Sequence, residues 1–465
     1  MSILNDAQRD LMRQRLAAAG IDAPAETAAV APEPVAADGS LGIAERRMWK
    51  IYEIDPESDS HNFAVHLTFG APYTLEQIVA STAKIIASSE VVCSVIEVSD
   101  DGPRRRPARR EGRWTVPGQV WEFGDIVADL DASAQVVAQA PFELTREQPW
   151  RVRIRALDDG TVSMILVIHH IGGDETILPP VLTALVSGNA ASWSGGGTAV
   201  DAATRTGVHA DAAVKHAQAT WAAEGIRYPL SGQLPATGPE KSWVSVMGEG
   251  RGALLHRRLD DAAVARLIAF ARDVDATPNS LFVAVSALTV YAVTGADDFV
   301  VLVPADNRAP AETVDRVGYS GNIVPMRFRF DSSATAGDAV RSAVTTVFEA
   351  MEHSSVDYGT LLTALRGAGG RFPVAEVMTL VKNAPLRGVP VPHGAHVTCE
   401  TVFKDVVHYP LSISFEFDEH NAVHLELEYR TDLLDEVYAE WVADVVESLA
   451  ATLPESADVV LSRLR

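Results

Sequence analysis

The sequence predicts an α+β protein built of two lobes. Apolar and alternating strand segments recur together with amphipathic helices in both halves of the 465-residue chain. A stretch rich in Gly, Ala and Ser, residues 190–250, separates these halves. A chain of this length holds two or three domains, or one large two-lobed body. We therefore expect the boundary between the lobes inside that stretch.

The composition limits the classes of function. The formal net charge is −23, so the surface repels phosphate backbones and nucleic acid is not an expected partner. The two cysteines, Cys93 and Cys399, lie far apart in the chain, which indicates a reducing compartment rather than a disulfide framework. No apolar run reaches membrane-spanning length, and residues 1–16 are too polar for a signal peptide. We expect a soluble cytoplasmic protein with no membrane partner.

Residues 1–38 are expected to form an appendage. A helix is predicted over residues 4–20, where Asn5 can cap its start and Gly20 can end it. The Ala/Pro-rich segment that follows has no period and is typical of a linker. The helix either packs loosely on the body or docks on a neighbouring protein.

The first half alternates helices and strands. The alternation of residues 62–70 predicts a strand. Thr74 is a suitable cap for an amphipathic helix over residues 74–89. Residues 162–170 form a continuous apolar run, which is typical of a buried central strand. The other expected elements are helices over residues 44–52 and 177–188 and a strand over residues 91–98.

The second half repeats these themes. A helix is predicted over residues 277–295, since Thr277 can cap it and Gly295 can end it. Residues 408–432 predict a β-hairpin with "DEHN" as its turn. The other expected elements are helices over residues 208–225, 260–275 and 435–453 and a strand over residues 298–308.

The segment "LVIHHIGGDET", residues 166–176, carries the main candidate site. Successive strand side chains point to opposite faces, so His169 and His170 do not suit one metal ion, and the dense spacings of zinc sites are absent. We therefore expect no metal. One imidazole would instead face a cleft as a proton acceptor, because histidine titrates near neutral pH. The alternative is a polar strand end with two satisfied histidines.

The residues after the histidines fit a catalytic turn. Gly172 and Gly173 allow the backbone to turn tightly and a narrow substrate to approach it. Asp174 lies four residues past His170. Its carboxylate either folds back to fix the turn or orients an imidazole.

Several motifs together resemble one family. "HHIGGD" is similar to the HHxxxDG signature of the condensation domains of nonribosomal peptide synthetases, and "LGIAERRMW" is similar to their opening S-x-A-Q-x-R-L-W motif. Further similar segments follow in the family's order, and the resemblance covers residues 40–465. These segments are residues 141–154, 301–308, 317–328, 372–385 and 427–436.

The resemblance implies two lobes like chloramphenicol acetyltransferase, set in a V, with the active site in a central tunnel. It implies an acyltransferase-type enzyme of secondary metabolism and antibiotic biosynthesis. Such an enzyme joins a carrier-bound acyl or peptidyl thioester to the amine of a carrier-bound aminoacyl acceptor. The implied partners are donor and acceptor peptidyl carrier proteins and neighbouring synthetase domains. The domain itself is expected to bind no cofactor, because its substrates arrive on the phosphopantetheine arms of the carrier proteins.

The resemblance also divides the chain and assigns roles to residues. The expected parts are a docking or linker segment at residues 1–38, an N-terminal lobe at residues 39–215 and a C-terminal lobe at residues 216–465. His170 matches the second motif histidine, which acts as a general base, or aligns the amine and stabilises the tetrahedral intermediate. Asp174 matches the structural aspartate. The residues expected to line the tunnel are Gly172, Gly173, Ser320 and Asn322.

The candidate catalytic residues are His170, Asp174, His169 and Glu175. Of these, His169 would point into its own lobe and stabilise it. Asn322 sits where the second lobe approaches the tunnel, and capping of a loop is its alternative role.

The chain departs from the family pattern at two points. Glu175 stands in place of the motif's final glycine, and Cys93 stands where the family has the arginine that pairs with the motif aspartate. Drift is one explanation, with another basic residue as the substitute. The other is a specialised subtype that dehydrates a carrier-bound Ser or Thr, in which His170 and Glu175 share the roles of base and acid. Further alternatives are an ester-forming variant and a catalytically silent carrier-docking platform, although relatives of the silent kind tend to lose the histidine pair.

The basic run "RRRPARR", residues 104–110, has two interpretations. Charge runs are usually solvated, so a solvated hairpin loop is expected. The alternative is a docking patch for an acidic carrier protein or for phosphopantetheine.

Overall fold

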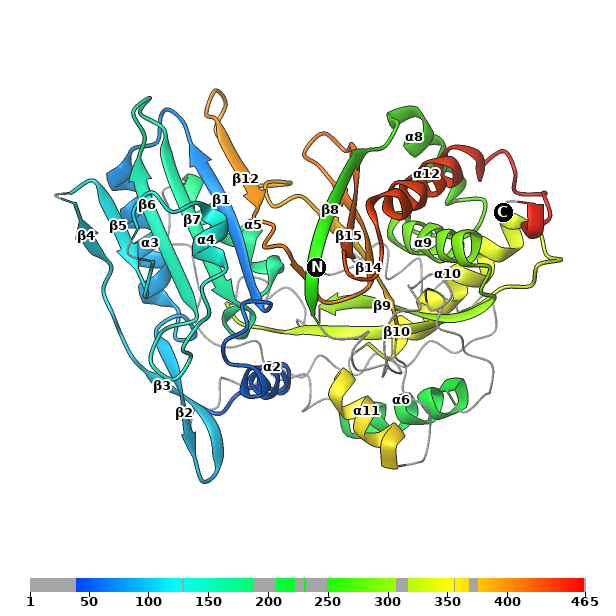
Figure 1. Ribbon diagram of the computed structural model, residues 1–465, viewed down its shortest axis with the longest axis horizontal. Helices are drawn as coiled ribbons and strands as arrows, with labels where there is room; N and C mark the ends of the chain where they lie inside the picture. The colour runs from blue at the N-terminus through cyan, green and yellow to red at the C-terminus, as the bar shows by residue number, and fades with distance from the viewer. Residues whose placement is uncertain are drawn as a thin grey trace.

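The computed structural model contains two large β-sheets with helices packed against them (Figure 1). The residues that it describes are 39–116, 118–127, 129–187, 206–221, 230, 249–306, 317–354, 356–367 and 375–463. The strands among them form a six-stranded sheet, a seven-stranded sheet and a separate two-stranded hairpin. The predicted α+β class is confirmed. Each large sheet with its helices is called here the first or the second lobe.

The first sheet is antiparallel and has the strand order β12-β1-β7-β6-β5-β4. Strand β7 lies inside it, and every residue of β7 is buried, as its continuous apolar run predicts. The strands are β1 (Asn62–Phe69), β4 (Arg113–Thr115), β5 (Val120–Phe123), β6 (Trp150–Ala156), β7 (Val162–His169) and β12 (Val397–Thr401).

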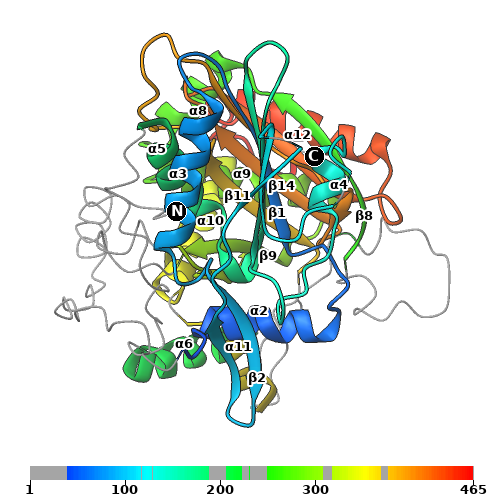
Figure 2. The same ribbon diagram turned by 90° about the vertical axis from the view of Figure 1, so that its left-hand side faces the viewer.

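Helices cover both faces of the first sheet. Helices α3 (Leu75–Ser88) and α5 (Leu178–Ser187) lie side by side (Figure 2) and share one hydrophobic core with the sheet. Helices α2 (Ile43–Ile54) and α4 (Ala134–Ala138) contribute to a second core on the other face. Thr74 caps α3 as predicted, because its Oγ1 accepts a hydrogen bond from the backbone N of Gln77 at 3.3 Å. Both faces of β7, the strand that ends at the histidine motif, are therefore covered.

The second sheet has the strand order β10-β9-β11-β14-β15-β8-β13. Strand β11 runs parallel to β9 and β14, and the other neighbours are antiparallel. Strands β14 and β15 form the predicted hairpin, whose turn residue Asn421 has φ 67°. The strands are β8 (Gly250–Arg258), β9 (Asp298–Asp306), β10 (Gly321–Arg329), β11 (Val377–Asn383), β13 (Val406–Val407), β14 (Leu411–Phe417) and β15 (Val423–Arg430).

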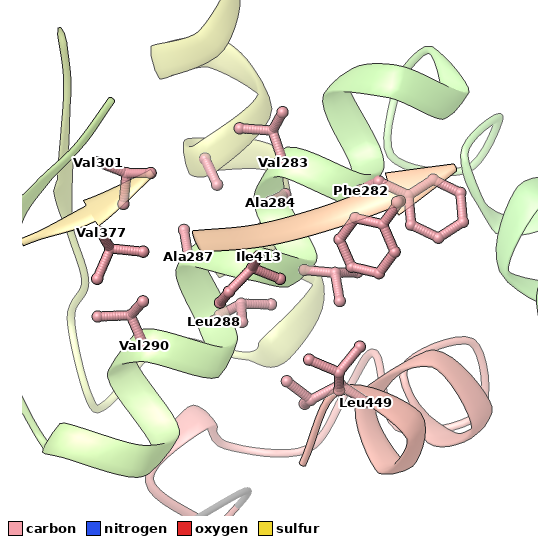
Figure 3. Packing of buried hydrophobic residues seen from close by; sticks show 14 of the residues in the cluster. Phe282, Val283, Ala284, Ala287, Leu288, Val290, Val301, Val377, Ile413 and Leu449 are labelled. Atoms are coloured by element: carbon pink, nitrogen blue, oxygen red, sulfur yellow. The ribbon is translucent and has the colours of Figure 1, made fainter. Parts of the chain in front are cut away.

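The core of the second lobe is built around helix α9 (Pro278–Thr294). Thr277 caps it and Gly295 ends it in the left-handed conformation, as predicted. Figure 3 shows apolar side chains of α9 packed against strand residues such as Val301 and Ile413 and against the last helix. Each buried Leu, Val, Ile or Phe side chain contributes about 1.5–3 kcal/mol. The other helices of this core are α8 (Asp261–Phe270), α10 (Ala336–Glu352) and α12 (Glu436–Thr452).

The two halves of the chain do not coincide with the two sheets. Strand β12, from the second half, pairs with β1 at the edge of the first sheet, so the expected C-terminal lobe contributes a strand to the N-terminal one. Helix α6 (Thr206–Trp221) packs on α11 (Tyr358–Gly367), and the two share a core with strand β9. The expected division between residues 215 and 216 falls inside α6, and a boundary before α6 fits this packing better.

The basic run is only partly solvated. Residues 104–107 belong to β3 (Gly102–Pro107), which pairs with β2 (Ser94–Ser99) in the separate hairpin. The side chain of Arg105 is only 7% exposed and donates a hydrogen bond to Glu45 Oε1 at 2.7 Å. The expectation of a solvated loop is therefore wrong for Arg105, because its partner comes from α2, far away in the sequence.

Two further expectations concern the N-terminal part of the chain. The helix and linker predicted for residues 1–38 lie outside the described residues. Cys93 comes just before β2 rather than on it, is buried, and donates its thiol hydrogen to Ile86 O at 3.2 Å. Within the described ranges, no helix is long and apolar enough to cross a membrane.

Candidate active site

The histidine motif forms a compact turn at the end of β7. The 3-10 helices η1 (His170–Gly172) and η2 (Glu175–Ile177) follow the strand directly. A Cβ at Gly172 would lie 2.6 Å from Pro149 Cβ, and one at Gly173, where φ is 154°, would lie 2.7 Å from Ile177 Cδ1. Both positions therefore require glycine. A larger side chain at either position would therefore displace the neighbouring groups of the turn.

His169 is a core residue, as predicted. Its side chain lies on the same face of β7 as Val167, is 2% exposed and meets the rings of Tyr52 and Phe142 edge-on. Its Nδ1 accepts a hydrogen bond from the backbone N of Ile171 at 3.1 Å. Burial lowers the pKa of His169 to about 3. A neutral imidazole here stabilises the turn from the inside.

His170 leaves the strand and faces the second lobe. Its ring lies 5.7 Å from the ring of Phe63 and 5.7 Å from that of Tyr319, which belongs to the second half of the chain. Its Nδ1 bonds to Gly173 O at 3.3 Å, and since a carbonyl only accepts, Nδ1 carries the hydrogen. Burial lowers the pKa of His170 to about 4, against the opposing effect of the Asp174 carboxylate. At neutral pH the imidazole is uncharged and Nε2 is an acceptor.

Asp174 joins the motif to the second lobe. Its Oδ1 accepts a hydrogen bond from the backbone N of Thr176 at 3.2 Å and another from the Thr176 hydroxyl. Its Oδ2 accepts from the backbone N of Ser320 at 3.2 Å. Ser320 is itself buried and donates its hydroxyl to Asp306 Oδ1 at 2.7 Å. This geometry supports a structural role for Asp174, and Ser320 serves as its partner across the two lobes.

Asn322 caps a loop, which was the alternative to lining the tunnel. Its Nδ2 donates to Ser354 O at 2.8 Å and to Val356 O at 2.7 Å, and its Oδ1 accepts from the backbone N of Tyr358 at 2.9 Å. Its Oδ1 also accepts a hydrogen bond from Nη1 of Arg47 in the first lobe at 3.4 Å, so all its side-chain polar atoms have partners. Its role beside the substrate remains a prediction without a free polar group to support it.

Arg47 of helix α2 fastens the first lobe to this loop. Its guanidinium forms an ion pair with Asp357 and donates to Gly321 O at 2.6 Å. It also lies 5.9 Å from the centre of the Tyr319 ring. Helix α2 lies below both sheets in Figure 1, and the contacts of Arg47 with Asp357 and Gly321 join the two lobes there.

Glu175 is exposed. Its carboxylate acts electrostatically on Lys382, whose Nζ lies 2.8 Å from Glu426 Oε2 and 3.2 Å from Glu416 Oε2. Glu428 belongs to the same face of the sheet, and burial raises its pKa to about 7. This polar face was missed from the sequence, although the alternation "LELEY" was its signal.

Cys93 stands where the family has an arginine, and another arginine, Arg105, contacts the motif turn. Arg105 donates from Nη2 to Ile171 O at 2.9 Å, so it holds the backbone of the motif turn. It reaches this carbonyl while paired with Glu45. A basic residue therefore stabilises the turn, and it does so by binding a backbone carbonyl.

Three residues near His170 were not predicted as site residues. His61 lies beside it, with ring centres 6.5 Å apart, and the His61 carbonyl accepts a hydrogen bond from the backbone N of His170 at 2.8 Å. The His408 ring lies 4.8 Å from that of His61. Lys404 is buried and donates to the Ser60 carbonyl, next to His61 in the chain. Only tertiary structure brings these groups together, and the sequence carries no spacing signal for them.

The described residues hold no cluster of three or more His, Cys, Asp or Glu side chains that suits a metal ion. A cavity of about 540 Å³ lies in the second lobe between α6, β10 and α10, lined by residues that include His216, Trp221 and His353. None of the motif residues lines it, so we place the candidate site at His170, where the polar groups of both lobes converge.

The two lobes and the histidine turn between them define a condensation-domain fold. A family model described as the condensation domain matches residues 230–460. The chain belongs to this family, the condensation domains of nonribosomal peptide synthetases. It is 24% identical to the phosphinothricin tripeptide synthetase PhsC of Streptomyces viridochromogenes over 97% of this chain and 42% of that protein. The chain thus spans less than half the length of this relative.

Solved structures show the same fold. The first condensation domain of the calcium-dependent antibiotic synthetase, in complex with a substrate analogue, matches with a TM-score of 0.71 at 17% identity, over 91% of this chain and 98% of that one. The X-domain from teicoplanin biosynthesis matches with a TM-score of 0.72 at 18% identity, over 95% of this chain and all of that one. The predicted resemblance and its fold are confirmed.

Proposed function

We propose that the chain forms amide bonds between two carrier-bound substrates. The donor is an acyl or peptidyl thioester and the acceptor is an aminoacyl thioester with a free amine, each on the phosphopantetheine arm of a carrier protein. The observation that carries this proposal is the Nε2 atom of His170. It has no hydrogen-bond partner among the described residues, and Gly173 O fixes the ring through Nδ1.

The proposed reaction needs one proton acceptor beside the amine. The amine nitrogen attacks the thioester carbonyl, the carbon–sulfur bond breaks, and the amine proton passes to His170 Nε2 and from there to the departing thiolate. Because a neutral amine is already nucleophilic, alignment of the amine by His170 contributes as well as proton removal. The Gly173 carbonyl orients the ring through Nδ1, and Asp174 keeps the turn in place through Ser320.

Two alternatives rest on specific observations. Dehydration of a carrier-bound Ser or Thr needs a second acid–base group, and Glu175 is an exposed carboxylate in the same turn. A silent docking platform is supported by the likeness to an X-domain, which has also been solved in a complex with OxyB. The retained histidine pair favours a catalytic role over the platform.

The test is a turnover assay with loaded carrier proteins, read by mass spectrometry of the carrier-bound products. His170→Ala should reduce amide formation by about 10²-fold or more, because positioned acid–base groups contribute 10²–10⁴-fold. The exposed His393 provides a matched control, and His393→Ala should retain wild-type turnover. Equal turnover by His170→Ala and wild type would remove His170 from the mechanism. A product lighter by one water would select dehydration.

A further inference from the structure

The segment 402–410 carries the chain from β12 in the first sheet back to the second sheet, and it is bonded to the loop before β1. Lys404 donates from Nζ to Ser60 O at 3.0 Å and also to Asp59 O. The Nε2 of His408 bonds to the same Ser60 carbonyl at 3.2 Å. The ammonium and the imidazole therefore share one acceptor and lie next to each other.

The loop before β1 also supports His170 through a backbone hydrogen bond. Its last residue, His61, accepts the backbone hydrogen bond of His170 at 2.8 Å. The His61 ring is 4.8 Å from that of His408 and 6.5 Å from that of His170. A continuous series of contacts thus runs from Lys404 through residues 59–61 to His170.

The ammonium stands among groups that also titrate. Lys404 is 8% exposed. Burial lowers its pKa to about 8, while the carboxylates of Asp59, Glu249 and Glu428 oppose this effect. At neutral pH it is still charged. Burial and the neighbouring imidazoles and ammonium lower the pKa of His61 to about 2. The charged or titratable groups that act on His170 include Asp174, His408, Lys404, His61 and His169.

We propose that Lys404 is a positioning residue: its ammonium holds the loop that supports His170 and, together with burial, disfavours the imidazolium form of the histidines around it. The proposal rests on the proposed function only in that a neutral His170 is needed to accept the amine proton. A positive charge beside an imidazole disfavours imidazolium, so loss of the charge makes protonation easier. A merely structural lysine would act through the hydrogen bonds alone.

The imidazole titrations test this without any substrate. In the full chain with ¹⁵N-labelled histidine, assigned with His61→Gln, His170→Ala and His408→Gln, the His170 signal of Lys404→Met should titrate higher by about half a pKa unit or more than in wild type. Lys404→Arg keeps the charge and should titrate like wild type. Lys382→Met removes a cation from the second sheet and serves as the matched control. A folded Lys404→Met with unchanged His170 titration would overturn the proposal.

A measurement on wild type covers the case in which Lys404→Met does not fold. The His408 signal should show an inflection near pH 8 as Lys404 loses its proton, because the two groups share the Ser60 carbonyl. Lys404→Arg should lack this inflection, since guanidinium does not titrate there. Its absence in wild type, or its persistence in Lys404→Arg, would contradict the proposal. Since no substrate is involved, a failure here is distinct from a failure of amide formation.

Discussion

The two large sheets differ in where their polar side chains lie. Helices cover both faces of the first sheet, and its candidate catalytic residue, His170, lies in the turn that ends β7. Helices α9 and α12 leave one face of the second sheet to polar side chains such as Lys382 and Glu428. In the first lobe, the geometry of a backbone turn therefore sets the position of His170. In the second lobe, the alternation of strand residues sets the position of the polar side chains. Changes in the first lobe should act on structure and activity together, whereas changes on the polar face should act through charge.

The largest effect is expected from crowding the turn. A Cβ at Gly172 would lie 2.6 Å from Pro149 Cβ and 3.2 Å from Trp150 Cδ1, so Gly172→Ala must displace the start of the motif. We expect a loss of about 1–3 kcal/mol in unfolding free energy, typical of overpacking, and a fall in amide formation of about 10-fold or more, since misplaced groups lose catalysis. Gly367→Ala is the control, because nothing lies within 4 Å of its added Cβ. Normal turnover by Gly172→Ala would show that the turn geometry is not limiting.

Acid should weaken the first lobe through His169. Its folded pKa, about 3, is below that of an unfolded histidine, so the unfolded state binds more protons and stability is lost as pH falls from about 6.5 towards 3. His169→Phe should remove about 1.4 kcal/mol per pH unit from this slope, while also lowering stability at pH 7 because Ile171 N loses its acceptor. Urea unfolding at several pH values measures both. An unchanged slope would mean that His169 is not the titrating group.

On the polar face, Glu428 should show the opposite pH dependence. Its folded pKa, about 7, is above that of an unfolded glutamate, so stability falls as pH rises from about 4.5 to 7. Glu428→Gln should stabilise the chain by about 1–2 kcal/mol at pH 8 and change little at pH 4.5. Glu426→Gln, which breaks the 2.8 Å ion pair with Lys382, should not stabilise it. Equal effects of Glu428→Gln and Glu426→Gln on stability at pH 8 would contradict the assignment of the raised pKa to Glu428.

The smallest effect is expected at Glu175. Its side chain is exposed, so Glu175→Gly should change amide formation by less than about twofold, as surface changes usually do. If Glu175 instead serves dehydration, the same variant should lose the product lighter by one water and keep the amide. Mass spectrometry of the carrier-bound product distinguishes the two outcomes.

Local rules were enough for the elements and for the motif histidines. The caps of α3 and α9 depend on neighbouring residues, and the burial of β7 follows from its own apolar run. The opposite directions of His169 and His170 follow from the period of a strand that ends between them. These features were predicted because the residues that cause them are close in sequence.

The partners of the site residues were not predictable in the same way. Asp174 bonds to Ser320, and Lys404 bonds to the loop before β1, across 146 and 344 residues. Arg105 was expected in solvent, yet Glu45 of another element buries it. Such contacts depend on which segments fold together, and a single sequence has no local pattern that encodes this choice.

Strand β12 has a consequence for recombining such domains. Its residues lie opposite β1, with Thr398 Oγ1 2.6 Å from Thr68 Oγ1 and Cys399 facing Leu67. A chimaera that exchanges only residues 39–187 would pair a β1 from one parent with a β12 from the other. Loss of that pairing would leave the edge of the first sheet open to other chains. The smallest exchangeable unit of this architecture therefore includes residues 397–401 together with the first lobe.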